Sequence, residues 1–211
     1  MKGLFVGMVA GLLFAAGVAR AEVVAPDVLI RATVQDVVAI VKQDKDIQAG
    51  NQKKILELVD AKVLPHFDFT RMTQLAVGKH WRTATVEQKK TLSAEFRNML
   101  VRTYTRAFVE YRNQTVEVLP FKMAADADEA TVKTMINKPG AQPIPVDYEM
   151  KKGANGWKAF DIVISGVSMV MSYRGTFDTE VQKNGIDGLI RMLSDKNINA
   201  ANVALSKAEK K

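Results

Sequence analysis

The fold depends on the stretch Trp157–Leu193, WKAFDIVISGVSMVMSYRGTFDTEVQKNGIDGLIRML, because the period of its apolar residues changes partway along it. Over residues 157–164 apolar side chains recur at every second position, which predicts a strand. After Gly166 they recur at the spacing of a helix. A strand should therefore lead into a helix through residues 165–168. Asn184-Gly185 should end that helix, before a short second one.

Four helices are expected before the sheet, because apolar residues recur along one side of each segment. Their expected positions are 26–41, 55–63, 70–77 and 85–113. The last is the longest periodic run, and residues 85–88, Thr-Val-Glu-Gln, fit a capping box at its start. Its other sides carry several basic and acidic residues, which is typical of a solvated surface.

Three strands should precede the one at 157–164, and their expected positions are 115–119, 130–137 and 144–151. Each has one apolar face, and turn residues separate them. This pattern predicts an α+β fold in which a curved, four-stranded antiparallel meander packs with helices. An NTF2-like core is the expected form of this fold.

The chain is expected to divide into three parts. Residues 1–21 should be a signal peptide and residues 22–194 one domain, while the tail 195–211 has weak periodicity and should be frayed. Within the domain, residues 22–82 should form a small, mainly helical annex. Residues 83–194 should then form the long helix, the sheet and the closing helices.

Residues 1–21 have the pattern of a secretory signal peptide. Lys2 precedes an apolar run over residues 4–18, and Ala19-Arg20-Ala21 has the small residues of a cleavage site. The run is shorter than the roughly 20 apolar residues that span a bilayer, so we expect cleavage after Ala21 and not a membrane anchor. The remaining chain of about 190 residues should be a soluble exported protein that can bury one substantial core.

The composition narrows the chemistry and the partners. The chain contains no cysteine, which excludes disulfides and metal–thiolate sites. Its net charge is +7, and loss of Lys2 and Arg20 with the signal peptide leaves 28 basic against 23 acidic residues, or +5. A positive excess in an exported protein favours anionic lipid or acidic protein surfaces over nucleic acid. A solvated basic surface without a specific partner fits the charge equally well.

The sequence contains no recognisable catalytic or metal-binding constellation. His66 and His80 are the only histidines, and neither has an acidic residue at the spacing of a metal site or a triad. The segment 166–170, GVSMV, lacks the second glycine of a nucleophile elbow. Asp147 and Asp161 alternate with apolar residues of the expected inner face, so both should point to solvent. We therefore predict no catalytic residue, no metal and no cofactor.

The expected inner face is apolar and rich in methionine, since eight of the ten methionines follow residue 21. Methionine fills irregular gaps and adapts to varied ligands. Such residues more often form a solid core than line a cavity, because protein interiors are densely packed. Three interpretations remain open on the residues alone: a carrier of an apolar ligand, an exported cone-shaped α+β enzyme for a small apolar substrate, or a solid-core interaction module.

The chain resembles the MlaC family of periplasmic phospholipid-binding proteins, also called the toluene-tolerance auxiliary family, from about Ile55 to Leu193. Five motifs carry the resemblance, and their order and spacing match as well. The motifs are VLPHFDF at 63–69, LAVGKHW at 75–81, FRNMLVRTY at 96–104, WKAFDIVISGVSM at 157–169 and NGIDGLI at 184–190.

The resemblance implies a carrier without enzymatic activity that holds phospholipid tails between sheet and helices and leaves the headgroup outside. It also implies lipid transport between an outer-membrane lipoprotein–porin complex and an inner-membrane ABC-transporter complex with a lipid-binding ring, which maintains the lipid asymmetry of the outer membrane. We expect a monomer that binds phospholipid and no nucleic acid. Arg97, Arg102, Arg106 and Lys89 are candidates for docking to acidic partner surfaces.

The residues expected to contact lipid are apolar or aromatic side chains of the long helix, the inner sheet face and the strand–helix junction. They are Leu75, Phe96, Met99, Leu100, Tyr104, Phe108, Val132, Tyr148, Phe160, Ile162, Ile164, Val167 and Met171. Val167 should lie at the mouth or wall of a pocket, where a glutamate would displace lipid without unfolding the protein. If Val167 instead belongs to a solid core, the same substitution should chiefly lower stability, by several degrees of melting temperature or to the point of preventing folding.

Overall fold

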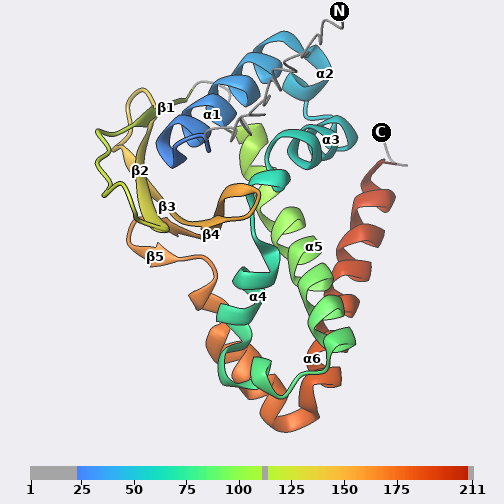
Figure 1. Ribbon diagram of the computed structural model, residues 1–211. Coiled ribbons are helices and arrows are strands. Elements are labelled where there is room, and N and C mark those ends of the chain that lie inside the picture. The colour runs from blue at the N-terminus through green and yellow to red at the C-terminus, as the bar shows by residue number, and fades with distance from the viewer. Residues whose placement is uncertain (1–22, 111–113, 209–211) are drawn as a thin grey trace, which may run out of the picture.

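The computed structural model describes residues 23–110 and 114–208, and of residues 106–110 and 203–208 only the backbone (Figure 1). The expected signal peptide lies outside the described residues, as does the expected end of the long helix near Asn113. Across the described ranges, no helix combines the length and apolar character needed to cross a membrane.

Five of the described α-helices precede the sheet in sequence and one follows it. The α-helices are α1 (Pro26–Gln43), α2 (Lys45–Gln48), α3 (Gln52–Lys62), α4 (Phe69–Val77), α5 (Val86–Glu110) and α6 (Arg174–Ala208). The short 3₁₀ helices are η1 (Leu64–His66), η2 (Gly78–Arg82) and η3 (Met171–Tyr173). The strands are β1 (Thr115–Val118), β2 (Glu129–Asn137), β3 (Ile144–Gly153), β4 (Gly156–Ile164) and β5 (Val167–Ser168).

The strands form one antiparallel sheet in the order β1-β2-β3-β4-β5, so each strand pairs with the next in sequence. This confirms the predicted meander and the α+β class, and the four expected strands are all present. The prediction of four strands is nevertheless wrong, because β5 is a fifth. With two residues, β5 is too short to produce a period in the sequence.

The junction after β4 is a tight hairpin. Ser165 and Gly166 have φ values of 50° and 82° and form the two-residue turn that brings β5 back beside β4. Such left-handed conformations match the twist of paired strands in short hairpins. The strand was expected to pass directly into a helix. Instead, the chain turns back as β5 and reaches α6 through η3.

The helical core is the largest of the three apolar clusters in the described residues, and it joins α4, η2, α5, the segment before η3 and α6. Its buried members are Met72, Ala76, Val77, Trp81, Leu92, Phe96, Met99, Leu100, Val170, Phe177, Val181, Leu189 and Leu193. Phe96 is fully buried at its centre. The Phe96 ring lies 5.3 Å from the Tyr173 ring and 5.2 Å from the Phe177 ring, both nearly edge-on, an arrangement that aromatic pairs prefer.

The sheet core is smaller and lies between α1 and the sheet. Its buried members are Ile30, Val118, Val132, Met150, Trp157 and Ala159. Figure 1 shows α1 lying across the sheet, while α4, most of α5 and α6 form a separate helical body. The two bodies are joined on one side by the chain through β5 and η3. On the other side, the Asp68 N–H donates to the Ala159 carbonyl of β4 at 2.8 Å.

Local capping explains where the long helix begins, and a glycine explains where α6 bends. The predicted capping box is confirmed, because the Thr85 N–H donates to Gln88 Oε1 at 3.0 Å and the Gln88 N–H donates to Thr85 Oγ1 at 3.1 Å. The helix end predicted at Asn184-Gly185 is also found, since Gly185 has a φ of 70° and divides α6 into two segments.

Helix α6 continues to Ala208, so most of residues 195–211 is helical where a frayed tail was expected. Asn197 explains part of the difference. It is buried, and its side-chain amide donates to the Glu95 carbonyl at 3.0 Å and to the Glu95 carboxylate at 2.6 Å. These bonds fasten the end of α6 to α5, a contact between residues about a hundred positions apart.

Candidate functional site

One face of the sheet carries most of its apolar residues, and we call it the inner face. By strand register its members are Val132 and Thr134 in β2, Val146, Tyr148 and Met150 in β3, Ala159, Ile162 and Ile164 in β4, and Val167 in β5. Under α1 this face is closed, since Val132 and Met150 are fully buried. At the β4–β5 hairpin it is open, because Ile164 is 37% exposed and Val167 is 64% exposed.

Three exposed apolar residues lie in the short stretch from the end of β4 to the start of η3, and we call Ile164, Val167 and Met171 the apolar tip. Ile164 and Val167 are directly opposite each other across the hairpin, so their side chains lie on the same face. Met171 begins η3, three residues after β5, and is 40% exposed. An apolar surface that continues from a buried interior to such a tip is suited to an apolar ligand.

Strand β4 contains a bulge that separates the two ends of the inner face. Glu149 pairs with Asp161 and Met150 with Ala159, which leaves Phe160 without a partner in β3. The simple alternation expected for Phe160, Ile162 and Ile164 therefore fails at Phe160. Its half-buried ring packs against the helical core, with the Arg71 guanidinium carbon 4.3 Å from the ring centre.

The expectation that Asp161 points to solvent is wrong. Asp161 does lie on the other face of the sheet from Ile162, as the alternation predicted. It is nevertheless only 6% exposed, because the segment from Ser168 to Met171 folds back over it. Its carboxylate accepts hydrogen bonds from the Ser168 hydroxyl and from the Ile162 and Val170 N–H groups. The group is fully engaged and lies away from the inner face, so it is unsuited to act as a general base there. Asp147, on the neighbouring strand, is half-buried.

Two tyrosines mark the boundary between the helical core and the surface. Tyr173 of η3 is half-buried, and its hydroxyl lies near that of Tyr104 in α5. Burial, together with that neighbouring hydroxyl, raises the pKa of Tyr173 to about 12. The Tyr173 phenol therefore stays neutral at physiological pH.

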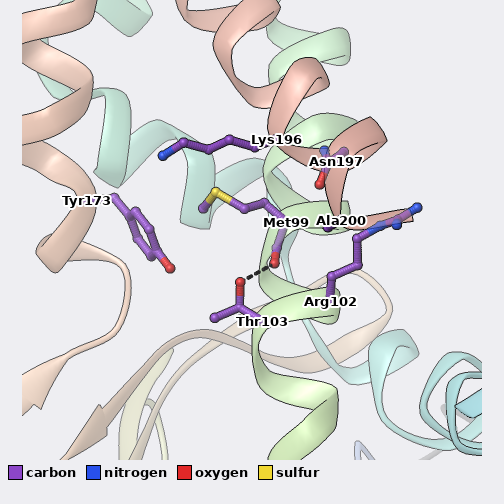
Figure 2. A pocket seen from close by; sticks show the side chains of 7 residues that line it. All are labelled: Met99, Arg102, Thr103, Tyr173, Lys196, Asn197 and Ala200. Atoms are coloured by element: carbon purple, nitrogen blue, oxygen red, sulfur yellow. Dashed lines mark hydrogen bonds between the residues drawn. The ribbon is translucent and has the colours of Figure 1, made fainter. Parts of the chain in front are cut away.

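Two adjoining clefts lie along the seam between α5 and α6. The first has a volume of about 240 Å³, and Figure 2 shows its walls: Met99, Arg102 and Thr103 of α5, Tyr173, and Lys196, Asn197 and Ala200 of α6. The second, of about 230 Å³, shares Arg102 and Asn197 with the first. Small-molecule sites usually measure about 300–1,000 Å³. Neither cleft alone would therefore hold a phospholipid with two acyl chains.

The residues expected to contact lipid fall into three environments. Phe96, Met99 and Leu100 are buried in the helical core, with Leu75, Tyr104 and Phe160 partly buried against it. Val132 is buried in the sheet core, and Tyr148 packs at its margin. Ile162 is half-buried beside the apolar tip, which contains the other three. Phe108 belongs to α5, but its side chain lies outside the described residues.

The basic residues expected to dock partners are not equally available. The Arg97 guanidinium forms an ion pair with Asp60, and the Lys89 ammonium lies 5.7 Å from the centre of a Trp81 ring. Arg102 is exposed and has no ion pair within the described part of the chain. The side chain of Arg106 lies outside the described residues.

His80 has an acidic partner that the sequence did not reveal. Its Nε2 lies 2.7 Å from the Asp178 carboxylate of α6, which also forms an ion pair with the Lys79 ammonium at 3.1 Å. The His80 and Lys79 contacts hold the pKa of Asp178 below its usual value. No cluster of three or more metal-ligating side chains is present in residues 23–110 and 114–208.

Sequence reasoning missed the polar groups that hold the β4–β5–η3 segment. Ser168 donates to Asp161, while its own oxygen accepts from the Met171 N–H at 2.9 Å. The available signal was Ser168 itself, because serine side chains readily form hydrogen bonds with backbone groups of neighbouring residues in turns. The alternating period concealed it, because the period assigned Asp161 to solvent.

Known proteins of similar sequence and structure agree on one family. The model of the MlaC protein family matches residues 31–195. The toluene tolerance protein Ttg2D of Pseudomonas putida is 24% identical over 163 residues, which cover 77% of this chain and 75% of that protein. The intermembrane phospholipid transport system binding protein MlaC of Haemophilus influenzae is 27% identical over 155 residues, covering 69% of this chain and 72% of that protein.

A solved structure extends the similarity to three dimensions. The phospholipid-binding protein of Ralstonia solanacearum, determined in complex with a phospholipid, is 38% identical in sequence and superposes with a TM-score of 0.77. The alignment covers 84% of this chain and 99% of the other.

Proposed function

The chain belongs to the MlaC family, and we propose that it is a periplasmic phospholipid carrier that holds acyl chains against the open end of its inner face. One observation carries the proposal: a protein 38% identical, with the same fold over 84% of this chain, was solved with a phospholipid bound. The name of the Haemophilus influenzae relative, a phospholipid transport system binding protein, points to the same function.

The open inner face suits such a ligand. An acyl chain of about sixteen carbons exposed to water costs on the order of 12 kcal/mol, at about 0.8 kcal/mol per CH₂. A carrier must therefore cover nearly the whole chain with apolar surface. Ile162, together with the apolar tip, offers surface that continues into the interior of the sheet. Among the residues expected to contact lipid, this group supports the proposal most directly, and the helical-core residues would form the supporting wall.

Transfer needs no covalent chemistry, and we propose that the protein is not an enzyme. Acyl chains in a bilayer are already out of water, so moving them into an apolar site is close to balanced in free energy. Small changes at a docking partner can then decide the direction. The Asp161 carboxylate already accepts three hydrogen bonds, so it is poorly suited to act as a general base, and this supports a carrier over an enzyme.

The proposed partners are the outer-membrane lipoprotein–porin complex and the inner-membrane ABC-transporter complex with a lipid-binding ring. The protein would act between them as a periplasmic monomer formed after removal of residues 1–21, with an NTF2-like core over residues 22–194. Arg102 is the best available docking residue on α5, because Arg97 is already paired. Docking through such charges should weaken with salt, since the Debye length falls from about 10 Å at 0.1 M to about 3 Å at 1 M.

Native mass spectrometry with lipid extraction tests the proposal on protein purified gently from the periplasm. The expected result is a mass increment of whole phospholipid, with headgroups in proportions close to those of the membrane, because acyl chains and not headgroups set the affinity. Protein that carries no lipid and takes none up from labelled phosphatidylethanolamine–phosphatidylglycerol vesicles would contradict the assignment. Lipid bound with one strongly preferred headgroup would retain the carrier function but contradict binding through the acyl chains alone.

A further inference from the structure

The buried carboxylate of Asp161 lies on the outer face of the sheet. Asp147, on the same face of the adjacent strand, is half-buried and forms no hydrogen bond or ion pair within the described residues. Burying a charged group costs free energy unless hydrogen bonds replace its hydration. Asp161 has such bonds, so the position is specifically built and is not an accident of packing. Neither the proposed lipid contact nor the helical core uses it.

Two of the three bonds of Asp161 lead to the segment that carries the apolar tip, and the third is local to β4. Oδ1 accepts from the Val170 N–H at 3.0 Å and from the Ile162 N–H at 2.8 Å, while Oδ2 accepts from the Ser168 hydroxyl. The Ser168 oxygen in turn accepts from the Met171 N–H at 2.9 Å. Asp161 and Ser168 therefore bind the backbone at both residues that precede and begin η3. We call this pair the clamp.

The rest of β5 offers little to hold the tip. Only two residue pairs, Val163 with Ser168 and Ile164 with Val167, join β5 to β4, followed by a bond from the Met169 N–H to the Ile162 carbonyl at 2.8 Å. On its other side β5 is the edge of the sheet. A two-residue edge strand with two exposed apolar side chains nearby is weakly held by pairing alone. The clamp supplies the further bonds that fix it.

We infer that Asp161 and Ser168 are positioning residues for the lipid site, which hold the apolar tip against the acyl chains and thereby set how slowly lipid is released. The inference rests on the proposed function. Neither residue touches lipid in this account, because both side chains point away from the inner face. They act through the placement of Val167 and Met171.

Two variants loosen the clamp by different routes. Asp161→Asn keeps the shape and one accepting oxygen but removes the charge, and it leaves the Ser168 hydroxyl proton without its carboxylate acceptor. Ser168→Ala removes the bridge to the Met171 N–H and disturbs the fold less. Hydrogen bonds to charged groups are among the stronger ones in proteins. We expect both variants to release fluorescent phospholipid to acceptor vesicles about tenfold faster than wild type, a change of about 1.4 kcal/mol.

Controls distinguish positioning from simple stability. Asp147→Asn removes a carboxylate from the same outer face on the adjacent strand, and it should release lipid at the wild-type rate. Ser168→Thr retains the hydroxyl and should restore slow release. Release is measured well below the melting temperature of every variant, so that partial unfolding does not contribute. If Asp161→Asn does not fold, the comparison of Ser168→Ala with Ser168→Thr decides the question alone.

Hydrogen exchange of lipid-free protein gives a readout that does not depend on lipid. The Val170 and Met171 amides should exchange faster in Asp161→Asn and Ser168→Ala, while amides of β2 and β3 should not change. Variants that melt earlier yet release lipid at the wild-type rate would show that the clamp is only structural and would overturn the inference. Wild-type protein that binds no phospholipid would overturn the proposed function, and the positioning role with it, even if exchange at the tip responds as expected.

Discussion

The helical core and the inner face of the sheet are built from similar apolar residues, yet they are closed to different extents. In the helical core Phe96, Leu92 and Leu189 are fully buried and are enclosed by helices α4, α5 and α6. On the inner face, burial falls from complete at Val132 to 64% exposure at Val167. The difference indicates that the helical core supplies stability, whereas the inner face leaves apolar surface available for a ligand.

The largest effect should come from opening a cavity in the helical core. Phe96→Ala removes a fully buried ring with two aromatic neighbours, and Phe→Ala changes in cores typically cost about 3–5 kcal/mol. Urea unfolding measures the loss. Val86→Ala is the control, because Val86 is 84% exposed and should change stability by less than about 0.5 kcal/mol. A loss below about 1.5 kcal/mol for Phe96→Ala would mean that this region is not closely packed.

The opposite behaviour is expected at the apolar tip. Its exposure excludes the solid-core reading for Val167, so Val167→Glu should lower the melting temperature by less than about 2 °C. The carboxylate would lie beside acyl chains, where an unpaired charge costs several kcal/mol, so retained phospholipid should fall at least about tenfold. Circular dichroism melting and lipid extraction test both parts. Val86→Glu provides the same substitution far from the tip, and normal lipid retention in Val167→Glu would remove Val167 from the site.

The third effect concerns the contact between η2 and α6 beside the helical core. The pKa of Asp178 is lowered chiefly by its hydrogen bond from His80 and then by Lys79. The folded state therefore binds fewer protons than the unfolded state in acid. The stabilisation should be complete above the ordinary carboxyl pKa of about 3.8 and should be lost as the pH falls through the lower, folded value. Asp178→Asn should flatten this part of the stability–pH curve measured by urea unfolding, and an unchanged slope would argue against the contact in solution.

The smallest effect is expected at His66, in η1, where the chain approaches β4. Burial, assisted by the charge of Lys158, lowers the pKa of His66 below its ordinary value of 6.5. The unfolded state then binds more protons than the folded state between the two pKa values, so stability should decline slightly as the pH falls below about 6.5. His66→Gln should remove this slope. NMR titration of the His66 ring checks the cause, and a pKa at or above 6.5 would contradict it.

Sequence periodicity predicted the parts of this fold that are long and regular. Strands β1 to β4, α1, α3, α4 and α5 lie where the apolar period placed them, and the capping box begins α5 within a residue of its expected start. The bulge at Phe160 and the two residues of β5 were missed, because one extra residue shifts a period of two and two residues cannot show one. The contact of His80 with Asp178 joins residues 98 positions apart, which no local pattern reports.

The candidate site was predicted less well than the fold, for a physical reason. Apolar period identifies which side chains turn inward but not whether anything covers them. Phe96 and Val167 appear equally apolar in sequence, yet one is buried and the other is 64% exposed. Asp161 shows the converse. The alternation correctly placed its side chain on the outer face of the sheet, but a later segment of the chain folds over that face and buries it.

The order of the strands has a consequence for self-association. Both edges of the sheet are formed by its shortest strands, β1 with four residues and β5 with two, whereas the central strands have nine or ten. Exposed edges are templates for pairing with other chains, and short edge strands are one way to prevent it. A protein that must display apolar surface while its ligand is absent is at particular risk of aggregation. β1 and β5 pair with only part of β2 and β4, but beyond them the Leu119 N–H donates to the Lys133 carbonyl and the Asp68 N–H donates to the Ala159 carbonyl. These contacts interrupt the remaining open backbone and shorten the length over which two empty molecules could join their sheets.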